Sequence, residues 1–233
     1  MQENNSTYIV KEVVQETTNV VTLKLSTDDG IPPYRAGQFI TVFFPETGHV
    51  EGKSYSISSA PHEKYMSITV KEIGTFSKKL CAKKVGDTIT ASRPYGYFYS
   101  ESETSSLVII TGGIGIAPFR SMILDVLSKS KERRIVLFYA NKTRASIIFK
   151  QEFDELSKTA NGRFVIQYHI TQEDDGSDAC HGRILASEIM KHGKQAPNPE
   201  FFICGSISFV RDYWRALKTE GISDEQIYTE AFF

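Results

Sequence analysis

A glycine-rich turn stands between an apolar run and an amphipathic stretch in the second half of the chain. Leu107–Ile110 is a run of buried-strand length, and Thr111–Pro118, with the sequence TGGIGIAP, precedes apolar residues at helical spacing. Glycines let a backbone turn sharply, and a helix N-terminus presents free N–H groups to phosphates. The turn therefore indicates a dinucleotide pyrophosphate site, although a tight turn without a ligand fits the same pattern. The candidate contacts are Thr111, Gly112, Gly113, Gly115 and Pro118.

A second candidate lies in the first half, where Lys53–Ser59 has the sequence KSYSISS. In an extended chain Lys53 and Tyr55 lie on one face, and Ser56 lies on the other. An aromatic ring beside a cation suits a ligand that has both a flat ring and a phosphate. We expect Lys53, Ser54, Tyr55 and Ser56 to bind such a ligand, Ser56 through its backbone. The alternative is an edge strand with a solvated hydroxyl face.

A third candidate is the segment Val70–Ser77, with the sequence VKEIGTFS, which opens a short helical stretch. Small and hydroxyl residues at a helix start can form a second nest for a phosphate. An ordinary helix N-cap by Thr75 or Ser77 is the alternative. The candidate contacts are Val70, Lys71, Gly74, Thr75, Phe76 and Ser77.

The elements that must hold these residues differ between the two halves of the chain. The first hundred residues contain short stretches rich in β-branched and aromatic residues, separated by turn formers. This pattern predicts a closed antiparallel β-barrel, interrupted by one helix over Phe76–Lys84. The predicted strands are Tyr8–Glu16, Val20–Ser26, Gln38–Pro45, Lys53–Ser58, Tyr65–Lys71 and Asp87–Ala91.

After the polar segment Ser100–Ser106 the period changes, and strands alternate with helices. That alternation predicts an α/β domain with a doubly wound parallel sheet. We therefore expect two domains, residues 1–103 and residues 104–233. The predicted strands are Leu107–Ile110, Ile135–Ala140, Phe164–Ile170, Phe201–Cys204 and Gln226–Thr229. One predicted helix follows Pro118, two cover Ala145–Ser157 and Ile184–His192, and the last ends at Gly221.

Composition narrows the class of protein. The 233 residues are 40% hydrophobic and 24% charged, which is ordinary for a globular chain. The net charge of −1 does not indicate a polyanion partner. Cys81, Cys180 and Cys204 are too few and too far apart for a cysteine-ligated iron–sulfur cluster, and they favour a reducing, cytoplasmic location. The histidines have no metal-ligand spacing, so no metal site is predicted. Neither a signal peptide nor a membrane span is expected.

Together these segments resemble the ferredoxin–NADP reductase superfamily over nearly the whole chain. The first family motif, Arg-x-Tyr-Ser, is matched with lysine in the arginine position. Motifs that agree in order and spacing are far more specific than any one of them. The matched segments are Lys53–Ser56, Gly74–Ser77, Gly86–Asp87, Pro94–Phe98, Gly112–Pro118, Cys204–Ser206 and Glu230–Phe232.

The resemblance implies two cofactors, FAD and NAD(P)H, and hydride transfer between them. It implies that Tyr55 stacks on the isoalloxazine ring, that Ser56 lies near flavin N5, and that Gly74–Ser77 cradles the FAD pyrophosphate. Family branches that use FMN tend to lack this nest, so FAD is favoured. Lysine at position 53 lacks the bidentate fork of arginine, which bears on flavin affinity.

On the nicotinamide side, the resemblance implies that Cys204 and Gly205 contact the nicotinamide ring and that Glu230 relays a proton or tunes the flavin. Phe232 would cover the flavin until nicotinamide displaces it, a role that Phe233 could take instead. The catalytic candidates are thus Ser56, Cys204, Glu230 and Phe232. The alternatives are a small buried hydrophobe at Cys204, a solvated carboxylate at Glu230, and core packing of the terminal aromatics.

Signals for the choice between NADH and NADPH conflict. Lys142 and Arg144 follow the second parallel strand, where cations could bind a 2′-phosphate, although plain surface charges fit equally. Arg183 matches a cofactor-contacting Gly-Arg of the family. Thr171–Gln172 stands where phosphate-binding relatives often have Ser-Arg, and the carboxylates that begin at Glu173 add repulsion. The balance favours NADH.

The partner implied is an external soluble carrier, such as ferredoxin, flavodoxin or an oxygenase component, which receives electrons singly. A second possibility is a non-catalytic electron-transfer or regulatory subunit of a larger redox complex. A third is a nucleotide-binding module with an empty barrel.

Overall fold

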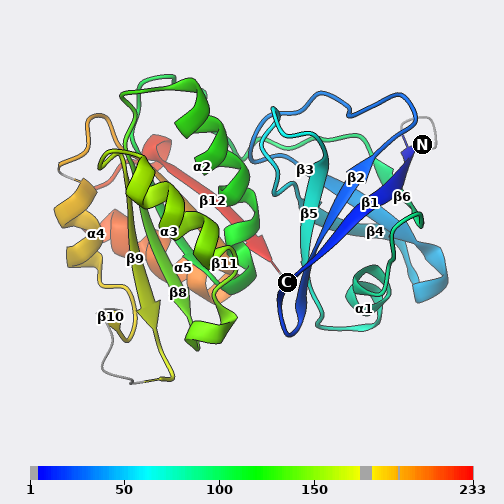
Figure 1. Ribbon diagram of the computed structural model, residues 1–233. Coiled ribbons are helices and arrows are strands. Elements are labelled where there is room, and N and C mark those ends of the chain that lie inside the picture. The colour runs from blue at the N-terminus through cyan, green and yellow to red at the C-terminus, as the bar shows by residue number, and fades with distance from the viewer. Residues whose placement is uncertain (1–4, 174–179, 194, 233) are drawn as a thin grey trace. The chain divides into compact units, whose positions relative to one another are not determined.

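The computed structural model describes residues 5–173, 180–193 and 195–232 (Figure 1). Contacts between Cα atoms divide the chain into two units. The first unit runs through Tyr99 and also contains Ala117–Asp125, whereas the second contains Ser100–Ile116 and the chain from Val126 onward. Each unit is built on a six-stranded sheet. Within the described ranges, no helix combines the length and the apolar character needed to cross a membrane.

The first unit is an antiparallel barrel. Its elements are β1 (Asn5–Thr17), β2 (Val20–Ser26), β3 (Phe39–Phe44), the 3₁₀ helix η1 (Pro45–Thr47), β4 (His49–Ser56), β5 (Met66–Lys71), α1 (Thr75–Cys81) and β6 (Thr88–Ser92). The strands pair in the order β4-β3-β6-β1-β2-β5, always antiparallel. Ile57, the residue that follows the edge strand β4, forms a bridge with Ile68 of the other edge strand β5, so the sheet closes on itself. This confirms the predicted barrel.

Alternate side chains of these strands fill the barrel interior. Buried residues of this core come from β1, β2, β3, β5 and β6, and Phe76 and Leu80 of α1 pack into the same core. Each buried aliphatic or aromatic side chain contributes about 1.5–3 kcal/mol relative to exposure. The helix that follows β5 is thereby fixed against the strands. The principal strand residues of this core are Tyr8, Val10, Leu23, Leu25, Ile40, Val42, Ile68 and Val70.

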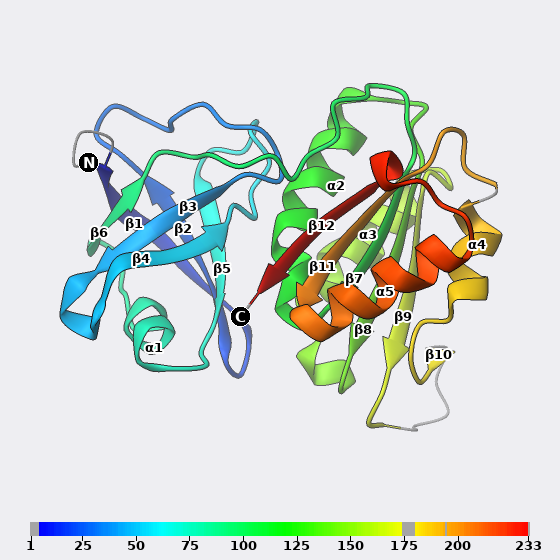
Figure 2. The same cartoon turned by 180° about the vertical axis from the view of Figure 1, so that it is seen from behind.

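The second unit is a parallel sheet in the order β10-β9-β8-β7-β11-β12. Its elements, with one helix shared with the first unit, are β7 (Leu107–Gly112), η2 (Gly113–Ile116), α2 (Ala117–Lys129), β8 (Ile135–Asn141), η3 (Arg144–Ser146), α3 (Lys150–Thr159), β9 (Phe164–Ile170), β10 (Cys180–His181), α4 (Ala186–Gly193), β11 (Glu200–Ser206), α5 (Ile207–Thr219), η4 (Asp224–Gln226) and β12 (Ile227–Phe232). Helix α3 covers one face, and α4 and α5 cover the other (Figures 1 and 2). The predicted doubly wound parallel sheet is confirmed.

Element boundaries differ from the sequence prediction at several places. The helix expected over Ala145–Ser157 begins only at Lys150, because Phe149 adopts a left-handed conformation with φ 61° and interrupts it. Helix α1 ends at Cys81 rather than Lys84. The short strand β10 was not predicted, since two residues carry no periodic signal.

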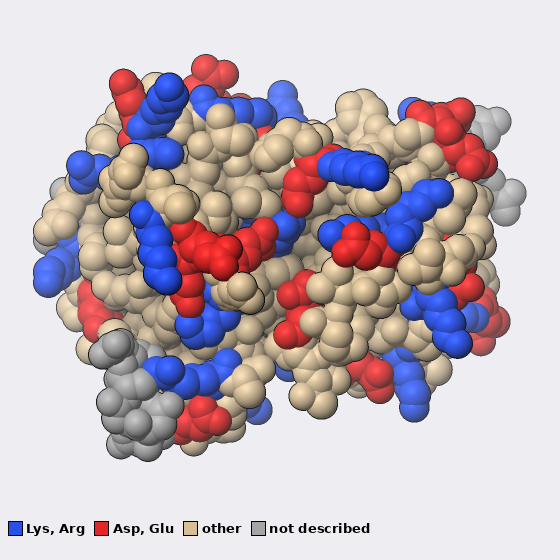
Figure 3. Space-filling model, in the orientation of Figure 1, with Lys and Arg blue, Asp and Glu red and all other residues tan. Residues whose placement is uncertain are grey.

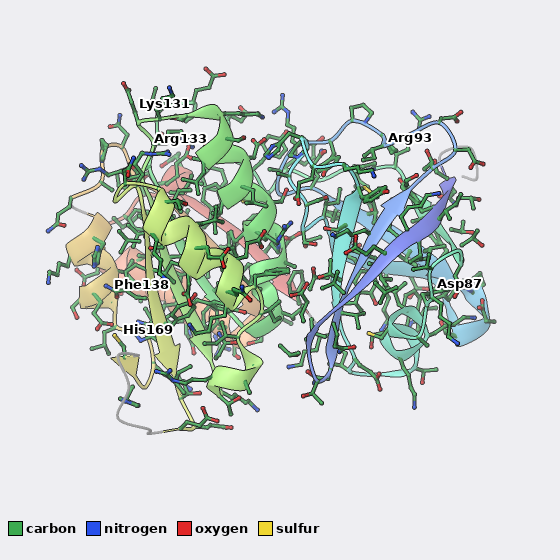
Figure 4. All side chains as sticks on the ribbon, in the orientation of Figure 1. Asp87, Arg93, Lys131, Arg133, Phe138 and His169 are labelled. Carbon is green, nitrogen blue, oxygen red and sulfur yellow. The ribbon has the colours of Figure 1, made fainter. Side chains whose placement is uncertain are left out.

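The polar segment that precedes β7 is tied to the second unit by Arg133, a buried residue labelled in Figure 4. Its Nε donates to the Ser105 carbonyl at 2.8 Å and its Nη2 donates to Ser100 Oγ at 3.1 Å. On the face shown in Figure 3, acidic and basic side chains both occur on each unit, in keeping with the net charge of −1.

Candidate functional site

In the first unit, Lys53 and Tyr55 share one neighbour, the ring of Phe76. Pairing with β3 sets Tyr55 opposite Ile40 and Lys53 opposite Val42, so both side chains leave the same face of β4. The Tyr55 and Phe76 rings stack with 6.3 Å between centroids and 21° between planes. Lys53 Nζ lies 5.8 Å from the same Phe76 centroid. Burial raises the pKa of the Tyr55 hydroxyl, so the ring stays neutral at pH 7.

The two serines of this strand have different surroundings. Ser54 is exposed, and its Oγ lies 3.2 Å from Thr41 Oγ1. Ser56 is buried, opposite Phe39. Because Ser56 leaves the face opposite to Tyr55, any contact with a ligand on the Tyr55 face runs through its backbone.

The segment from Gly74 to Ser77 forms a tight entry into α1. Ser77 Oγ accepts from the N–H groups of Ile73 and Gly74 at 2.9 and 3.0 Å and donates to the Gly74 carbonyl at 3.0 Å. The Ser77 side chain therefore holds the turn from the third helical position, and the N-cap residue is Gly74 rather than Thr75 or Ser77. The first N–H groups of the helix have no partner within it. A Cβ at Gly74 would meet nothing within 4 Å, so there is open space beside these donors.

The remaining members of this candidate group are split between core and surface. Val70 is fully buried, and its carbonyl accepts a weak hydrogen bond from Cys81 Sγ at 3.7 Å. Lys71 is half-buried and Thr75 is exposed. A flat ring surface, a cation and an open helix start thus occur in one unit, and these residues fit FAD.

In the second unit, five side chains form one row across the sheet. The strand registers align Tyr168 of β9 with Tyr139 of β8, Thr111 of β7, Cys204 of β11 and Glu230 of β12. Residues in register on parallel strands leave the same face of a sheet. The row lies near the carboxyl ends of the strands, where ligands bind in open α/β sheets. The structure therefore brings together three sequence candidates: Thr111, Cys204 and Glu230.

The glycine turn folds back against this row. Thr111 Oγ1 donates to the Cys204 carbonyl at 2.9 Å. A Cβ at Gly115 would lie 2.5 Å from the same carbonyl oxygen, so only glycine fits there. Gly113 has φ +54°, and a Cβ there would meet nothing within 4 Å. Gly115 thus serves close packing, whereas Gly113 borders open space beside a helix N-terminus, which fits a pyrophosphate.

The other residues of this turn support its shape. Gly112 packs against Phe209, since a Cβ at Gly112 would lie 3.2 Å from that ring. Gly205 approaches the same ring, with 2.9 Å from its ideal Cβ position. Pro118 lies in the first turn of α2, where its missing N–H costs nothing.

Cys204 is a neutral, buried thiol. Its side chain is fully buried, and burial, together with the charge of Glu230, raises its pKa well above the usual value. Glu230 and Phe232 are both half-buried and lie on the same face of β12, two residues apart. Phe232 pairs with Ser206. Phe233 lies outside the described residues.

The Glu173 carboxylate is bound by the segment that carries Lys142 and Arg144, the candidate cations for a 2′-phosphate. The Arg144 N–H donates to the Glu173 carboxylate at 2.8 Å, and the Gln172 N–H donates to the Lys142 carbonyl at 3.0 Å. Lys142 is exposed. Arg183 is exposed on the segment before α4, where its charge opposes the effect of burial on the Tyr213 pKa.

Sequence reasoning missed two groups that support these sites. In the first unit, the Arg120 guanidinium binds both Glu63 carboxylate oxygens, at 2.9 and 3.1 Å, and the Ser58 carbonyl at 2.9 Å. In the second unit, the Tyr139 hydroxyl bonds to the glycine turn. These partners lie 26 to 62 positions apart in sequence, so local patterns carry no signal for them.

Comparison with known proteins agrees with this geometry. Residues 6–99 match the model of the oxidoreductase FAD-binding domain, and residues 109–214 match that of the oxidoreductase NAD-binding domain. The flavohemoprotein of Bacillus subtilis is 28% identical over 233 residues, covering 97% of this chain and 58% of that protein. The flavohem-like FAD/NAD-binding domain of nitric oxide dioxygenase from Vibrio cholerae is 26% identical, with a TM-score of 0.86 and 99% of each chain covered.

A ferredoxin–NADP⁺ reductase from Neisseria gonorrhoeae, solved with FAD and NADP, shares the fold, with a TM-score of 0.82 and 20% identity over both whole chains. The chain belongs to the ferredoxin–NADP reductase superfamily. It is an oxidoreductase whose cofactors are FAD and a nicotinamide dinucleotide. It spans 58% of the length of the Bacillus subtilis flavohemoprotein.

Proposed function

We propose that the chain oxidises NADH, holds the resulting electron pair on FAD, and releases the electrons singly to an external protein carrier. The observation that carries this proposal is the row of Thr111, Cys204 and Glu230 beside the glycine turn. The buried Cys204 thiol is protonated at neutral pH, so the row suits holding a ring rather than nucleophilic attack. When bound, the nicotinamide supplies a hydride and the flavin accepts it and returns electrons one at a time.

In the proposed flavin site, each residue has a binding or orienting role. Tyr55, backed by Phe76, supplies a neutral stacking face for the isoalloxazine ring, and Ser56 lies beside N5 through its backbone. Lys53 neutralises a phosphate as a point charge. The N–H groups of Gly74–Ser77 bind the pyrophosphate.

In the proposed nicotinamide site, the turn from Thr111 to Pro118 binds the pyrophosphate through backbone N–H groups. Cys204 and Gly205 contact the nicotinamide ring, and Glu230, in register with Cys204, relays a proton or tunes the flavin. Phe232, on the same face of β12 as Glu230, is proposed to stack on the flavin ring.

For the coenzyme, we propose NADH. Support comes from the Glu173 carboxylate, held by the Arg144 N–H, because a carboxylate accepts a ribose 2′-OH and repels a 2′-phosphate. Lys142, Arg144 and Arg183 then bind the remainder of the adenosine end. We expect Glu173→Gln to narrow the preference for NADH over NADPH about two- to fivefold in kcat/KM, since one repulsive charge is worth about 0.4–1 kcal/mol.

The proposed carrier is a soluble protein such as a ferredoxin, a flavodoxin or an oxygenase component, in a cytoplasmic setting. Support comes from the three widely spaced cysteines, which cannot ligate a cluster of the ferredoxin type within this chain. We also propose that residues 1–103 bind FAD and residues 104–233 bind the dinucleotide, a division supported by the family-model matches.

The deciding experiment is anaerobic stopped-flow reduction of the purified yellow protein, with NADH and NADPH compared. We expect rapid bleaching by NADH and slower bleaching by NADPH. Adding ferricyanide, a one-electron acceptor, should then restore the colour. A yellow protein that neither coenzyme bleaches would support the subunit alternative, and a colourless protein would support the nucleotide-binding module.

A further inference from the structure

The hydroxyl of Tyr139 joins two segments that the sheet itself does not connect. Tyr139 is fully buried on β8. Its hydroxyl donates to the Gly113 carbonyl at 3.0 Å and accepts the Ile148 N–H at 3.2 Å. The first partner belongs to the glycine turn, and the second belongs to the segment that carries Lys142 and Arg144.

The bond to Gly113 sets the direction of the next N–H group. In a trans peptide the carbonyl and the following N–H point in opposite directions. Because the hydroxyl draws the Gly113 carbonyl toward the buried face of β8, the Ile114 N–H points away from it. Gly113 holds a left-handed φ of +54°, and a Cβ there would meet nothing within 4 Å. The hydroxyl therefore sets the direction of a donor at the entry of the helix formed by η2 and α2.

The bond to Ile148 restrains the segment that is proposed to bind the adenosine end of the coenzyme. Ile148 follows η3 and precedes Phe149, whose left-handed conformation begins α3. The same segment holds the Arg144 N–H against Glu173. One hydroxyl thus fixes both the turn proposed for the pyrophosphate and the segment proposed for the adenosine end.

We propose that Tyr139 is a positioning residue for the dinucleotide, whose hydroxyl couples the glycine turn to the segment of residues 142–149. The inference rests on the proposed function, because it concerns the same dinucleotide site. Tyr139 is not proposed to touch the reacting atoms, and its hydroxyl acts through Gly113 and Ile148.

The test compares Tyr139→Phe with Tyr168→Phe in the full chain loaded with FAD. Tyr168 is the matched control, because it lies in the same row and its hydroxyl donates to Asp154 at 2.8 Å rather than to the turn. Titration with ADP-ribose should give a dissociation constant raised about three- to tenfold for Tyr139→Phe, as expected for a lost hydrogen bond. Tyr168→Phe should stay within about twofold. In turnover, Tyr139→Phe should raise the KM for NADH and leave kcat within about twofold.

Amide hydrogen exchange provides a second readout. ADP-ribose should slow exchange in wild-type residues 111–118 and 142–149 together, and in Tyr139→Phe it should protect the two segments unequally. Wild-type affinity in Tyr139→Phe, or protection of only one segment in the wild type, would overturn the coupling. A wild-type chain that binds no ADP-ribose at all would instead overturn the proposed dinucleotide function itself.

Discussion

At the scale of single residues, Phe76 occupies a variable position of the Gly-x-x-Ser motif and supports the proposed flavin site. Its ring packs on Phe44 with 5.0 Å between centroids, stacks on Tyr55, and lies under the Lys53 ammonium. Lysine binds a phosphate as a point charge and lacks the fork that fixes an arginine. The Phe76 ring offers Lys53 a cation–π contact that restricts where its charge lies.

Loss of the Tyr55 ring should therefore cost flavin retention. We expect Tyr55→Ala to lose at least half of its bound flavin, measured as the ratio of absorbance at the flavin band to that at 280 nm. A ring face that stacks on a ligand contributes about 0.5–1.5 kcal/mol beyond the area it buries. Tyr55→Phe should retain flavin, and Tyr97→Ala, at an exposed tyrosine of the same unit, is the control. Unchanged flavin content in Tyr55→Ala would remove Tyr55 from the stacking role.

Because of Cys81, we expect the stability of the first unit to fall at alkaline pH. Burial, followed by the charge of Glu72, raises the pKa of its thiol from 9.0 to about 11. The unfolded thiol loses its proton first, so the free energy of unfolding falls as the pH rises from 9 toward 11. In urea titrations monitored by flavin release, Cys81→Ala should lose less stability than the wild type over this window. Identical slopes for both chains would contradict the assignment.

At the scale of elements, two glycines of the same turn should respond differently to alanine. At Gly115 a Cβ would meet the Cys204 carbonyl oxygen at 2.5 Å, so the turn must move. We expect Gly115→Ala to destabilise the second unit by about 1–3 kcal/mol and to weaken ADP-ribose binding at least about tenfold. Gly113→Ala meets no atoms and should cost about 1–2 kcal/mol for its left-handed φ alone. Urea unfolding and titration measure both, and wild-type binding by Gly115→Ala would refute the packing role.

The sequence predicted the type and order of nearly all elements, because their periods of two and 3.6 are local. It missed the late start of α3, since the left-handed Phe149 follows from tertiary packing rather than from a local turn signal. It also missed Arg120 and Tyr139, because the hydrogen bonds that define their roles join distant positions. Motif residues were found, whereas the residues that hold them in place were not.

At the scale of the whole molecule, helix α2 is divided between the first and the second unit. Its residues Ala117–Asp125 group with the barrel, although they follow β7 of the second unit in sequence. In the first unit, Phe98 packs against Phe119 with 5.6 Å between ring centroids, and Ser121 donates to the Ser59 carbonyl. The first unit is therefore completed by a segment from beyond residue 103.

This division predicts which unit loses stability when Arg120 is changed. The Arg120 and Glu63 side chains are only 14% and 31% exposed, so Arg120→Leu leaves a carboxylate and the Ser58 carbonyl poorly compensated. We expect a loss of about 1–3 kcal/mol in the first unit.

Two probes separate the units in a thermal scan of Arg120→Leu. Flavin release reports the first unit, and Trp214, the single tryptophan, lies on α5 of the second. We expect flavin release to shift to lower temperature by more than the Trp214 fluorescence transition does. Arg211→Leu removes an exposed ion pair with Asp212 and should shift either transition little, since such pairs contribute about 0–1 kcal/mol. A larger shift of the Trp214 transition in Arg120→Leu would show that the start of α2 stabilises the second unit instead.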